Sequence, residues 1–551
     1  MLSYRKLAMH VLGRPLHTGG SDSPRPASQR AAAFILTAAM LTTLTAPAFA
    51  KEWYIEEGDI TVRAGETEGT NKVSQGENPE VEDTNTVITN SDKDTASSNT
   101  VTIEAKDKDD KVEVTLKDVN IDTSSRSEAA VSVTGEGNTN IELDGDNALK
   151  SGIYSSGISS SGSLTISGGE NDSLTAQGGS GADGIHSSGS LTISGGTVTA
   201  NGGSGADGGD GGDGIWSSGG VTISGGSTVT ANGGDGKDDY GGDGIRSDSG
   251  DVTISGGSTV TANGGNGGNV SGDGIRSDSG DVTISGGTVK AAGGDSKDGY
   301  GGDGIRSGGV TISGGTVNAA GGNGGKVGGY GICSFARVAI SGGTVNAAGG
   351  NGKNSNGGSD GIISNDIDLS GSLELTAKAG RPNGKAISWA GHELDLDTIK
   401  DKLGPGAKVT ATDANGETKQ VSSPIPRPVE PEKPVIPEES SSSSDGGSAT
   451  PSAPASPLPG LTVTDKDGQR ISYTSTQSGN TLTVCVGRFT ASLRTSLATL
   501  RQLRAEGIET ITFQTILCST TLSVDELLAM GGEDAEAVLT HRLTASSLTV
   551  G

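Results

Sequence analysis

The most constraining feature of this sequence is a unit of roughly thirty residues that recurs from about residue 152 to residue 363. Each unit contains a Gly-Ile step, and consecutive steps are 27 to 32 residues apart. Such even spacing predicts a solenoid, in which every unit stacks on the next one and buries its apolar face there. The isoleucines of these steps are Ile153, Ile185, Ile215, Ile245, Ile275, Ile305, Ile332 and Ile362.

Apolar and polar residues alternate within each unit, as in Val221-Thr222-Ile223. This period of two is typical of a strand with one buried face. Two further apolar landmarks follow each Gly-Ile step, so we expect three short strands per unit. The predicted fold class is therefore all-β, namely a parallel β-helix with three strands per coil, and each strand should pair with the same strand in the coils above and below.

Glycine accounts for 94 of the 551 residues, more than twice the usual share of about 7%. Because these glycines are periodic, we assign them to the corners between strands, where positive φ values are needed, as at Gly225-Gly226. The asparagines that end one strand of three consecutive units should stack as a ladder at one corner. They are Asn201, Asn232 and Asn263.

Four segments are expected. Residues 1–50 resemble a secretory signal, with an apolar run from Ala31 that ends in Ala-Phe-Ala and predicts cleavage after Ala50. Residues 51–422 form the β-helix, and the Pro/Ser-rich segment 423–459 is a linker, since it contains too few apolar residues to bury a core. Residues 460–551 form a small α+β domain.

The α+β assignment of the last segment depends on two helix patterns. A capping box at Ser523 predicts a short second helix. Leucines at helical spacing predict the first helix, which should stop at Gly507. These leucines are Leu493, Leu497, Leu500 and Leu503.

The charge of the chain excludes some partners. The formal charge is −27 and becomes −31 once the signal is removed, because five basic residues leave together with Asp22. Nucleic acid and anionic lipid are therefore poor partners, and no transmembrane segment is expected in the mature chain. The three cysteines, Cys333, Cys485 and Cys518, allow at most one disulfide.

The residue after each Gly-Ile step should point outward, because the isoleucine before it points inward. Adjacent members of this column would lie about 4.8 Å apart, close to the advance of one sugar along an extended polysaccharide. Aromatic rings suit sugar faces, and arginines suit carboxylates. The alternative is a solvated surface column without a ligand. Three stacked arginines would repel one another unless acids such as Asp248 and Asp278, or an anionic ligand such as a uronic-acid polymer, relieve them. The candidate carbohydrate-binding residues are Tyr154, His186, Trp216, Arg246, Arg276 and Arg306.

The residue before most Gly-Ile steps is an aspartate, and stacked carboxylates repel unless something offsets their charge. Oxygen ligands of this kind suit Ca²⁺, so we expect structural calcium. The alternative is that the aspartates make Asx turns. The candidate metal ligands are Asp183, Asp213, Asp243, Asp273 and Asp303.

The repeats, such as SGSLTISGGTVTANGG, and the lead-in VEVTLKDVNIDTSSRSEAAVSVTGEGNTNIEL resemble a family of secreted bacterial carbohydrate-binding domain proteins. The resemblance covers about residues 52–400 and implies a pectate-lyase-like right-handed β-helix. It also implies binding of cellulosic or pectic polysaccharide with structural Ca²⁺. No ligand set of the family maps onto individual residues of this chain.

We therefore expect a secreted or surface-associated, non-catalytic polysaccharide-binding protein. The C-terminal domain would be free to contact a cell-surface partner. One alternative is a structural adhesin that binds host or wall proteins. Another is a polysaccharide lyase that uses Arg246, Arg276 or Arg306 as its base, although a repeated arginine is more typical of binding than of one tuned base.

Overall fold

The computed structural model describes residues 51–423, apart from residues 68, 207 and 356, and residues 461–550 with several short gaps. The signal segment and nearly all of the expected linker lie outside the described residues, as does Cys518. The described chain forms two compact units, which divide between residues 426 and 427. No helix within the described ranges is long and apolar enough to cross a membrane.

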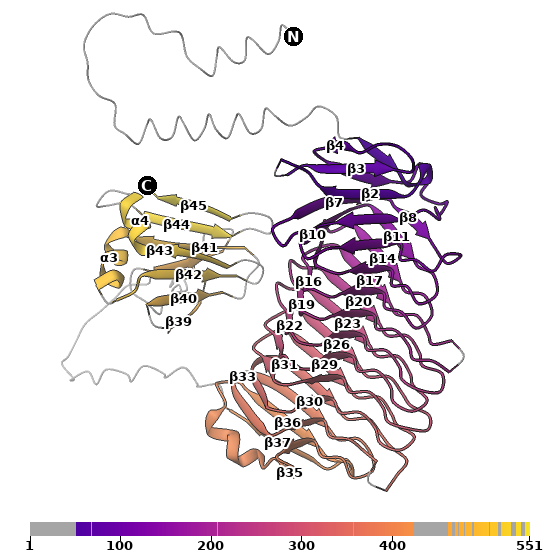
Figure 1. Ribbon diagram of the computed structural model, residues 1–551. Coiled ribbons are helices and arrows are strands. Elements are labelled where there is room, and N and C mark those ends of the chain that lie inside the picture. Colours follow the sequence, from indigo (N-terminus) through magenta and orange to yellow (C-terminus); the bar gives the residue numbers. More distant parts are fainter. Residues whose placement is uncertain are drawn as a thin grey trace, which may run out of the picture. The chain divides into compact units, whose positions relative to one another are not determined.

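The first unit is a parallel β-solenoid, and it confirms the predicted fold class (Figure 1). Each turn of the central part, here called a rung, contributes three strands, such as β18 (Ile215–Ser217), β19 (Val221–Ile223) and β20 (Thr228–Asn232). The first strand of each rung joins a 15-stranded sheet, and the other two join a 22-stranded sheet. The register is that of the sequence repeat, since Ile215 lies opposite Ile245 of the next rung.

The 15-stranded sheet carries the side chains of interest. Besides β18 it contains β2 (Ile60–Ala64), β3 (Asn71–Gln75), β4 (Val81–Asp83), β6 (Val101–Glu104), β9 (Val131–Thr134), β12 (Ile158–Ser160), β15 (Ile185–Ser187), β21 (Ile245–Ser247), β24 (Ile275–Ser277), β27 (Ile305–Ser307), β30 (Ile332–Ser334), β32 (Ile362–Ser364), β34 (Ile387–Trp389) and β35 (His392–Glu393).

The 22-stranded sheet supplies the remaining walls of the solenoid. Besides β19 and β20 it contains β1 (Glu52–Tyr54), β5 (Thr86–Thr89), β7 (Lys111–Lys117), β8 (Asn120–Asp122), β10 (Asn138–Asp144), β11 (Asp146–Lys150), β13 (Ser163–Gly168), β14 (Ser173–Gln177), β16 (Leu191–Ile193), β17 (Thr197–Asn201), β22 (Val252–Ile254), β23 (Thr259–Asn263), β25 (Val282–Ile284), β26 (Thr288–Ala292), β28 (Val310–Ile312), β29 (Thr316–Ala320), β31 (Arg337–Ala348), β33 (Asp366–Lys378), β36 (Lys408–Thr412) and β37 (Thr418–Ser422).

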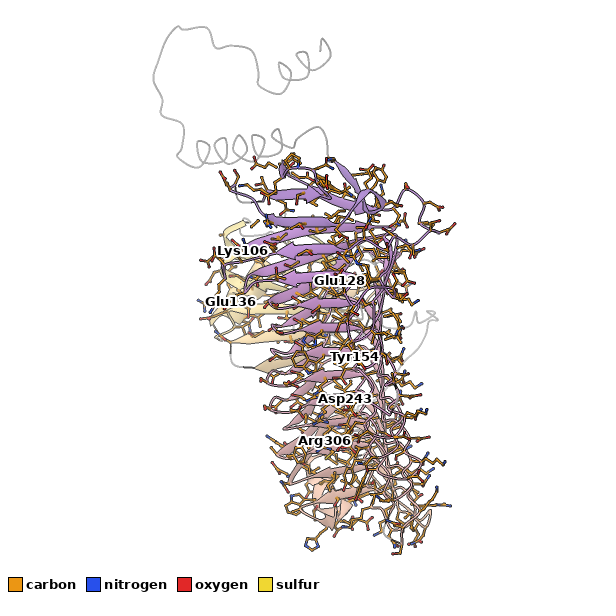
Figure 2. The ribbon with its side chains drawn as sticks, turned by 45° about the vertical axis from the view of Figure 1, so that its right-hand side comes forward. Lys106, Glu128, Glu136, Tyr154, Asp243 and Arg306 are labelled. Atoms are coloured by element: carbon orange, nitrogen blue, oxygen red, sulfur yellow. The ribbon has the colours of Figure 1, made fainter. Side chains whose placement is uncertain are left out.

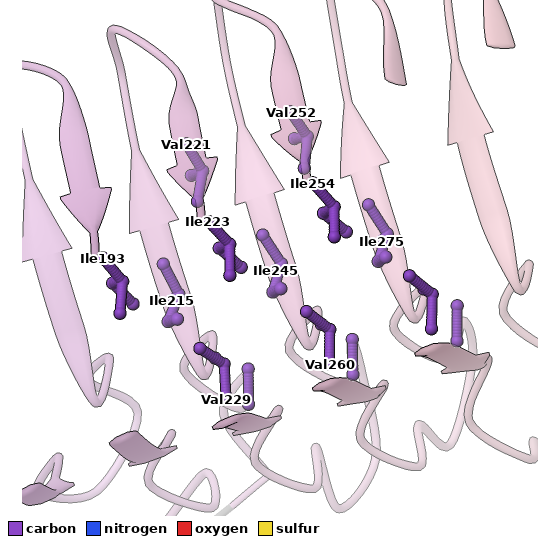
Figure 3. Close-up of a cluster of buried hydrophobic side chains, with 14 of the residues drawn as sticks. Ile193, Ile215, Val221, Ile223, Val229, Ile245, Val252, Ile254, Val260 and Ile275 are labelled. Carbon is purple, nitrogen blue, oxygen red and sulfur yellow. The ribbon is translucent and has the colours of Figure 1, made fainter. Parts of the chain in front are cut away.

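One apolar core runs through the whole solenoid, from Trp53 to Val421. In the central rungs it consists of columns of isoleucine, valine and alanine, such as Ile223 above Ile254 (Figure 3). Each isoleucine of these columns is fully buried, which stabilises the fold by about 1.5–3 kcal/mol per side chain before the entropy cost is counted.

Both ends of the stack are closed by antiparallel pairs. At the N-terminal end β2, β3 and β4 form an antiparallel meander. At the C-terminal end β37 pairs with β36, and a 3₁₀ helix, η2 (Leu396–Lys402), buries Leu396 and Ile399. A second 3₁₀ helix, η1 (Ile55–Glu57), lies near the N-terminal end. Irregular ends protect a solenoid from pairing with other open strand edges.

The corners explain the glycine content. Gly225 and Gly226 have φ values of 68° and 73°, which glycine adopts without strain. At other corners space is the constraint: a Cβ atom added to Gly234 would lie 2.2 Å from the carbonyl oxygen of Gly203 in the rung before it. The predicted asparagine ladder is confirmed, because Asn232 Nδ2 donates to Asn201 Oδ1 and Asn263 Nδ2 to Asn232 Oδ1, both at 2.8 Å.

One of the predicted Gly-Ile steps is wrong. Ile153 lies in a turn with 55% of its surface exposed, whereas Ile158 takes the inward position opposite Ile185. The segment before β12 closes on itself, since Ser151 Oγ donates to the Ser156 carbonyl oxygen at 2.7 Å. This local turn delays the start of the strand by five residues.

Within the described residues, the second unit contains two four-stranded sheets and two helices. Its helices are α3 (Leu497–Ala505) and α4 (Val524–Met530), which begins directly after Ser523 as the capping box predicts. Leu497, Leu500 and Leu503 are buried on α3, but Leu493 lies in a strand, so its assignment to the helix was wrong. The strands are β38 (Leu461–Thr464), β41 (Ala491–Ser496), β44 (Glu536–His541) and β45 (Ser546–Val550), then β39 (Thr474–Ser478), β40 (Thr481–Cys485), β42 (Thr510–Gln514) and β43 (Ser519–Ser523).

Candidate functional site

The structure brings five of the six predicted carbohydrate-binding residues into one line on the outer face of the 15-stranded sheet. They occupy the middle positions of β15, β18, β21, β24 and β27, and each lies directly opposite the next in register. Their neighbours in each strand are buried, while they are half-buried. We call them the outward column: His186, Trp216, Arg246, Arg276 and Arg306.

Tyr154 does not belong to the outward column. The residue opposite His186 is Ser159, because the local turn shifts the strand away from Ile153. Tyr154 lies in that turn with φ 61° and 77% of its surface exposed. Its ring nevertheless remains close to the loop that precedes β15, since a Cβ atom added to Gly181 would lie 3.8 Å from it.

The first two members of the outward column form an aromatic pair. The ring centroids of His186 and Trp216 are 4.2 Å apart with an angle of 18° between the planes. Asp183 fixes the imidazole, since its Oδ2 lies 2.8 Å from His186 Nδ1. The two stacked rings therefore continue from one rung to the next as a rigid surface.

A hollow of about 510 Å³ lies beside this pair, toward the N-terminal end of the column. Serine hydroxyls of the preceding rungs, Ser132 and Ser159, line it together with His186. Tyr154 and Glu128 belong to the same hollow. In Figure 2, Glu128, Tyr154, Asp243 and Arg306 follow one another along this side of the solenoid.

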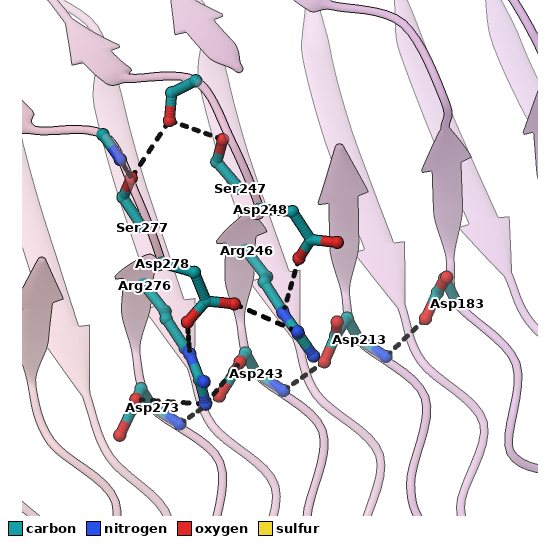
Figure 4. A network of polar contacts seen from close by, with 12 residues as sticks. Asp183, Asp213, Asp243, Arg246, Ser247, Asp248, Asp273, Arg276, Ser277 and Asp278 are labelled. Atoms are coloured by element: carbon teal, nitrogen blue, oxygen red, sulfur yellow. Dashed lines mark hydrogen bonds and ion pairs between the residues drawn. The ribbon is translucent and has the colours of Figure 1, made fainter. Parts of the chain in front are cut away.

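Two arginines of the outward column, Arg246 and Arg276, are paired with acids of the turns that follow their strands (Figure 4), whereas Arg306 Nη1 lies 3.8 Å from Asp303 Oδ2. Arg246 Nε lies 3.0 Å from Asp248 Oδ1, and Arg246 Nη2 lies 3.1 Å from Asp278 Oδ2. Arg276 Nε donates to the other oxygen of Asp278 at 2.6 Å. Asp248 and Asp278 therefore offset the repulsion between Arg246 and Arg276, which is one of the two means that the sequence left open, the other being an anionic ligand.

The five aspartates predicted as metal ligands form a ladder of a different kind. Oδ1 of each accepts the backbone N–H at the equivalent position of the next rung, with distances of 2.5–2.7 Å (Figure 4). The last step of this run joins Asp303 to the amide of Tyr330. We call this run the aspartate ladder: Asp183, Asp213, Asp243, Asp273 and Asp303.

The aspartate ladder is buried from its second member onward, with Asp243, Asp273 and Asp303 each 5% exposed. Burial is the main cause of their raised pKa values, which are about 7 for Asp243 and Asp273 and about 6 for Asp303. For Asp243 and Asp273 the carboxylate of the next rung adds to the shift. Burial also raises the pKa of Asp213, and the carboxylates of Asp243 and Asp183 add to it.

The oxygen atoms of the aspartate ladder do not form a ligand set that fits Ca²⁺. One oxygen of each carboxylate is already taken by a backbone N–H, and Arg276 Nη1 lies 3.8 Å from Asp243 Oδ2 and 4.0 Å from Asp273 Oδ2. Ca²⁺ needs six to eight oxygen ligands, and an arginine beside it would repel it. Within the described residues, no three His, Cys, Asp or Glu side chains converge to hold a metal ion. Calcium remains a prediction, and a thermal melt with and without a chelator tests it.

Arg246 and Arg276 are held in their charged form. Burial works toward a lower pKa for Arg246 and Arg276, but the carboxylates of the aspartate ladder, with Asp243 common to both arginines, outweigh it and raise both pKa values above the ordinary value. A catalytic base must give up its proton near the working pH. These two side chains are therefore suited to binding rather than to proton abstraction.

Sequence reasoning found the outward column but missed how the aspartates are used. The available signal was the repeated Asp-Gly-Ile, in which the aspartate amide recurs once per rung and can meet the carboxylate of the rung before it. Sequence reasoning also missed the hollow, because its wall comes from a turn that breaks the repeat.

A family model described as a Beta helix repeat matches the chain at residues 191–215, 221–245, 282–305 and 310–332, all within the central rungs. Comparisons with curated proteins and with solved structures gave no match. The β-helix repeats of the expected resemblance are thus supported, and its carbohydrate-binding and secreted character remain predictions.

Proposed function

We propose that this chain is a secreted, non-catalytic protein that binds a polysaccharide along the outward column. The observation that carries the proposal is the stacked pair of His186 and Trp216 beside a hollow bordered by Tyr154. Flat aromatic faces suit the apolar faces of sugar rings, while the serines and carboxylates of the hollow suit sugar hydroxyls. Rungs repeat about every 4.8 Å, so that successive sugars would meet successive rungs.

The ion pairs favour a neutral glycan over an acidic one. Each arginine of the pair Arg246 and Arg276 already contacts a carboxylate outside the ladder, and Asp278 bridges the two. An anionic polymer would have to displace these acids or lie beside them. Of the two expected classes, we therefore propose a cellulosic glycan rather than a pectic one on this face.

The fold and the sequence support the proposal at a coarser level. The β-helix repeat match is consistent with polysaccharide-related or adhesin-like proteins. The apolar segment that ends at Ala50 supports export. Mature protein recovered outside the producing cell should begin at Lys51, and a retained leader would contradict the secretion part of the proposal.

Affinity electrophoresis of the full mature chain in gels that contain soluble cellulosic glucan tests the site. Replacing His186 and Trp216 together by alanine should weaken binding at least about tenfold, equivalent to ~1.4 kcal/mol. Trp389→Ala is the matched control, because Trp389 lies in β34 at the far end of the same sheet with 51% of its surface exposed. Equal retention of the double variant and the control would remove the outward column from consideration.

Incubation with polygalacturonate separates binding from cleavage. A lyase leaves unsaturated products that absorb in the ultraviolet. Because Arg246 and Arg276 are held protonated, we expect no such product. If unsaturated products appeared with the unaltered chain and were absent with an Arg276→Lys variant, the non-catalytic part of the proposal would be overturned.

A further inference from the structure

A second surface lies on the loops that connect the last strand of one rung to the first strand of the next. Parallel bridges align these loops, pairing Gly236 with Gly267, Gly267 with Ser296, and Gly324 with Gly352. The residues that directly follow the bridged positions therefore form their own line along the stack. This line reads Lys237, Gly268, Lys297, Gly325 and Lys353.

Lysine and glycine alternate in this line for a steric reason. A Cβ atom on Gly268 would lie 2.7 Å from backbone atoms of Asp238, and one on Gly325 would lie 2.1 Å from the carbonyl oxygen of Lys297. The rungs between the lysines are thus pinned close to the preceding loop. Since rungs repeat about every 4.8 Å, the lysines recur about every 9.6 Å.

These lysines line a groove of about 820 Å³, here called the loop-edge groove. A second side-chain ladder lies along it: Asp235 Oδ1 accepts the amide of Asn266, and Asn266 Oδ1 accepts that of Asp295. Asp295 Oδ1 continues the ladder to Asn323 at 2.6 Å. The acids of the groove therefore each use an oxygen within the fold.

The lysines have no such partner. Among the described residues no carboxylate lies within 4.0 Å of the ammonium group of Lys237, Lys297 or Lys353, all of which are exposed. Within the described part of the chain, one of the three ammonium groups makes a hydrogen bond: Lys353 Nζ donates to the Lys297 carbonyl oxygen at 3.4 Å. A regular line of cations without carboxylate partners is unusual in a chain of net charge −27. Asp238, Asp239 and Asp298 lie in the same loops, and their carboxylates repel anions that do not match the lysines.

The same loops carry tyrosines with the same alternation. Tyr240 and Tyr300 are each 47% exposed, and Val270 lies between them in register. Lys326 Nζ lies 5.7 Å from the ring centroid of Tyr300. The loops that supply Lys237 and Lys297 thus also each supply an exposed aromatic ring, although neither ring lines the groove itself.

We infer that the loop-edge groove is a second binding site, for an acidic polysaccharide that carries one anionic group on every second sugar. Among the lysines that line the groove, one is anchored on every second rung; Lys326 of an intervening rung lies near Tyr300 and does not line it. Two rungs correspond to two sugars if one sugar spans one rung, as in the proposed function. A carboxylate or a sulfate would both satisfy the ammonium groups.

Binding of the full mature chain to hyaluronan, which carries a carboxylate on alternate sugars, tests the inference. Replacing Lys237, Lys297 and Lys353 together by glutamine should weaken binding at least about tenfold, and added salt should weaken binding of the unaltered chain. The matched control replaces Lys290, Lys378 and Lys402, three exposed lysines elsewhere, and should bind as the unaltered chain does. Chondroitin sulfate in place of hyaluronan distinguishes a preference for sulfate from one for carboxylate.

The inference would be overturned if the two triple variants bound hyaluronan equally well, or if the unaltered chain bound neutral dextran as well as hyaluronan. Binding of polyglutamate as strong as that of hyaluronan would also overturn it and would indicate an acidic peptide instead. Equal binding of polygalacturonate, charged on every sugar, would contradict the two-rung spacing. The His186 and Trp216 double variant should keep its affinity for hyaluronan, so failure of this inference and failure of the proposed function remain distinguishable.

Discussion

The first coils, residues 52–178, and the central rungs, residues 185–348, build one continuous core from different side chains. The first coils contain seven-residue strands such as β7 and β10, and they bury Trp53, whose indole nitrogen donates to Asp83 at 2.7 Å. The central rungs use three- and five-residue strands from β15 to β30, followed by the 12-residue β31, and their core consists of columns of isoleucine, valine and alanine. Similar neighbours supply matching partners at the core positions, so a repeated rung needs neither large side chains nor long strands.

The two regions also handle charge in opposite ways. In the first coils, surface pairs such as Arg63 with Glu104 lower the carboxylate pKa, with the Arg63 hydrogen bond as the main cause. In the central rungs, burial raises the pKa of the aspartate ladder. The same fold therefore contains one region that protonation weakens and another that protonation strengthens.

The largest expected effect comes from breaking a central column. Ile254→Ala should cost about 2–5 kcal/mol, because the ladders on either side prevent the cavity from collapsing. Amide hydrogen exchange is the appropriate measurement, since long repeat arrays need not unfold in one step. Protection should fall in β19, β22 and β25 and persist in β7 and β10.

Ile254→Val serves as the control for that experiment and should cost only about 0.5–1.5 kcal/mol. If exchange rose equally in β7 and β10, the two regions would be one cooperative unit. The distinction between templated rungs and self-sufficient first coils would then fail.

The next effect concerns the corners. Gly234→Ala places a Cβ atom 2.2 Å from a carbonyl oxygen of the preceding rung, and the backbone shift should cost about 1–3 kcal/mol. Gly286→Ala is the matched control, because nothing lies within 4 Å of its added Cβ atom. Thermal melts of both variants check this, and equal midpoints would show that the corners tolerate side chains.

The charge contrast gives a pH prediction. The folded-state pKa of Asp243 is about 7 against an ordinary value of 3.8, so its contribution to stability is complete below about pH 3.8 and is lost as the pH rises through 7. Asp243→Asn keeps an acceptor for the amide of Asp273 and removes the charge. At pH 8 the free energy of unfolding should therefore rise by at least about 1.4 kcal/mol, the equivalent of one pKa unit.

The opposite sign applies to Glu104. Its pKa is lowered by Arg63, so its contribution is present above the ordinary value of 4.5 and is lost as the pH falls. Glu104→Gln should destabilise the first coils at pH 7 and have little effect at pH 3. Denaturant titrations in chelator at pH 3, 5 and 8 check both variants, and slopes of the same sign would contradict the contrast.

Most of the fold could be predicted because the repeat itself encodes the register. Once Ile185 and Ile215 are aligned, the second strands follow at the same offset, as Leu191 lies opposite Val221. The third strands are displaced by one residue and need their own landmark, the pair of Val198 and Val229. The prediction failed at Ile153, where a serine-rich turn closes locally, and at Leu493, whose spacing suits either a helix or a strand. Both errors lie where the chain departs from repetition.

The candidate site could be predicted only in part for the same reason. Alternation places His186 and Trp216 outward, but their stacking depends on Asp183, which the sequence suggested as a metal ligand. The repeated Asp-Gly-Ile places one aspartate amide in every rung, but the same pattern also suits metal ligands and Asx turns, so the sequence did not single out the amide as the partner of the aspartate ladder. Lys237, Lys297 and Lys353 recur in every second rung, and the repeat of about thirty residues makes this longer period hard to notice in the sequence.

The smallest effect tests whether repetition itself is stabilising. Asn232 donates to Asn201 and accepts from Asn263, whereas Asn263 makes only the first kind of bond within the described ladder. The next rung places Ala292 opposite Asn263. Since a neutral hydrogen bond contributes about 0.5–1.5 kcal/mol net, Asn232→Ala should cost about twice as much as Asn263→Ala in a thermal melt. Equal costs would mean that the number of bonds between asparagines does not determine the loss, and the ladder would then not stabilise the stack.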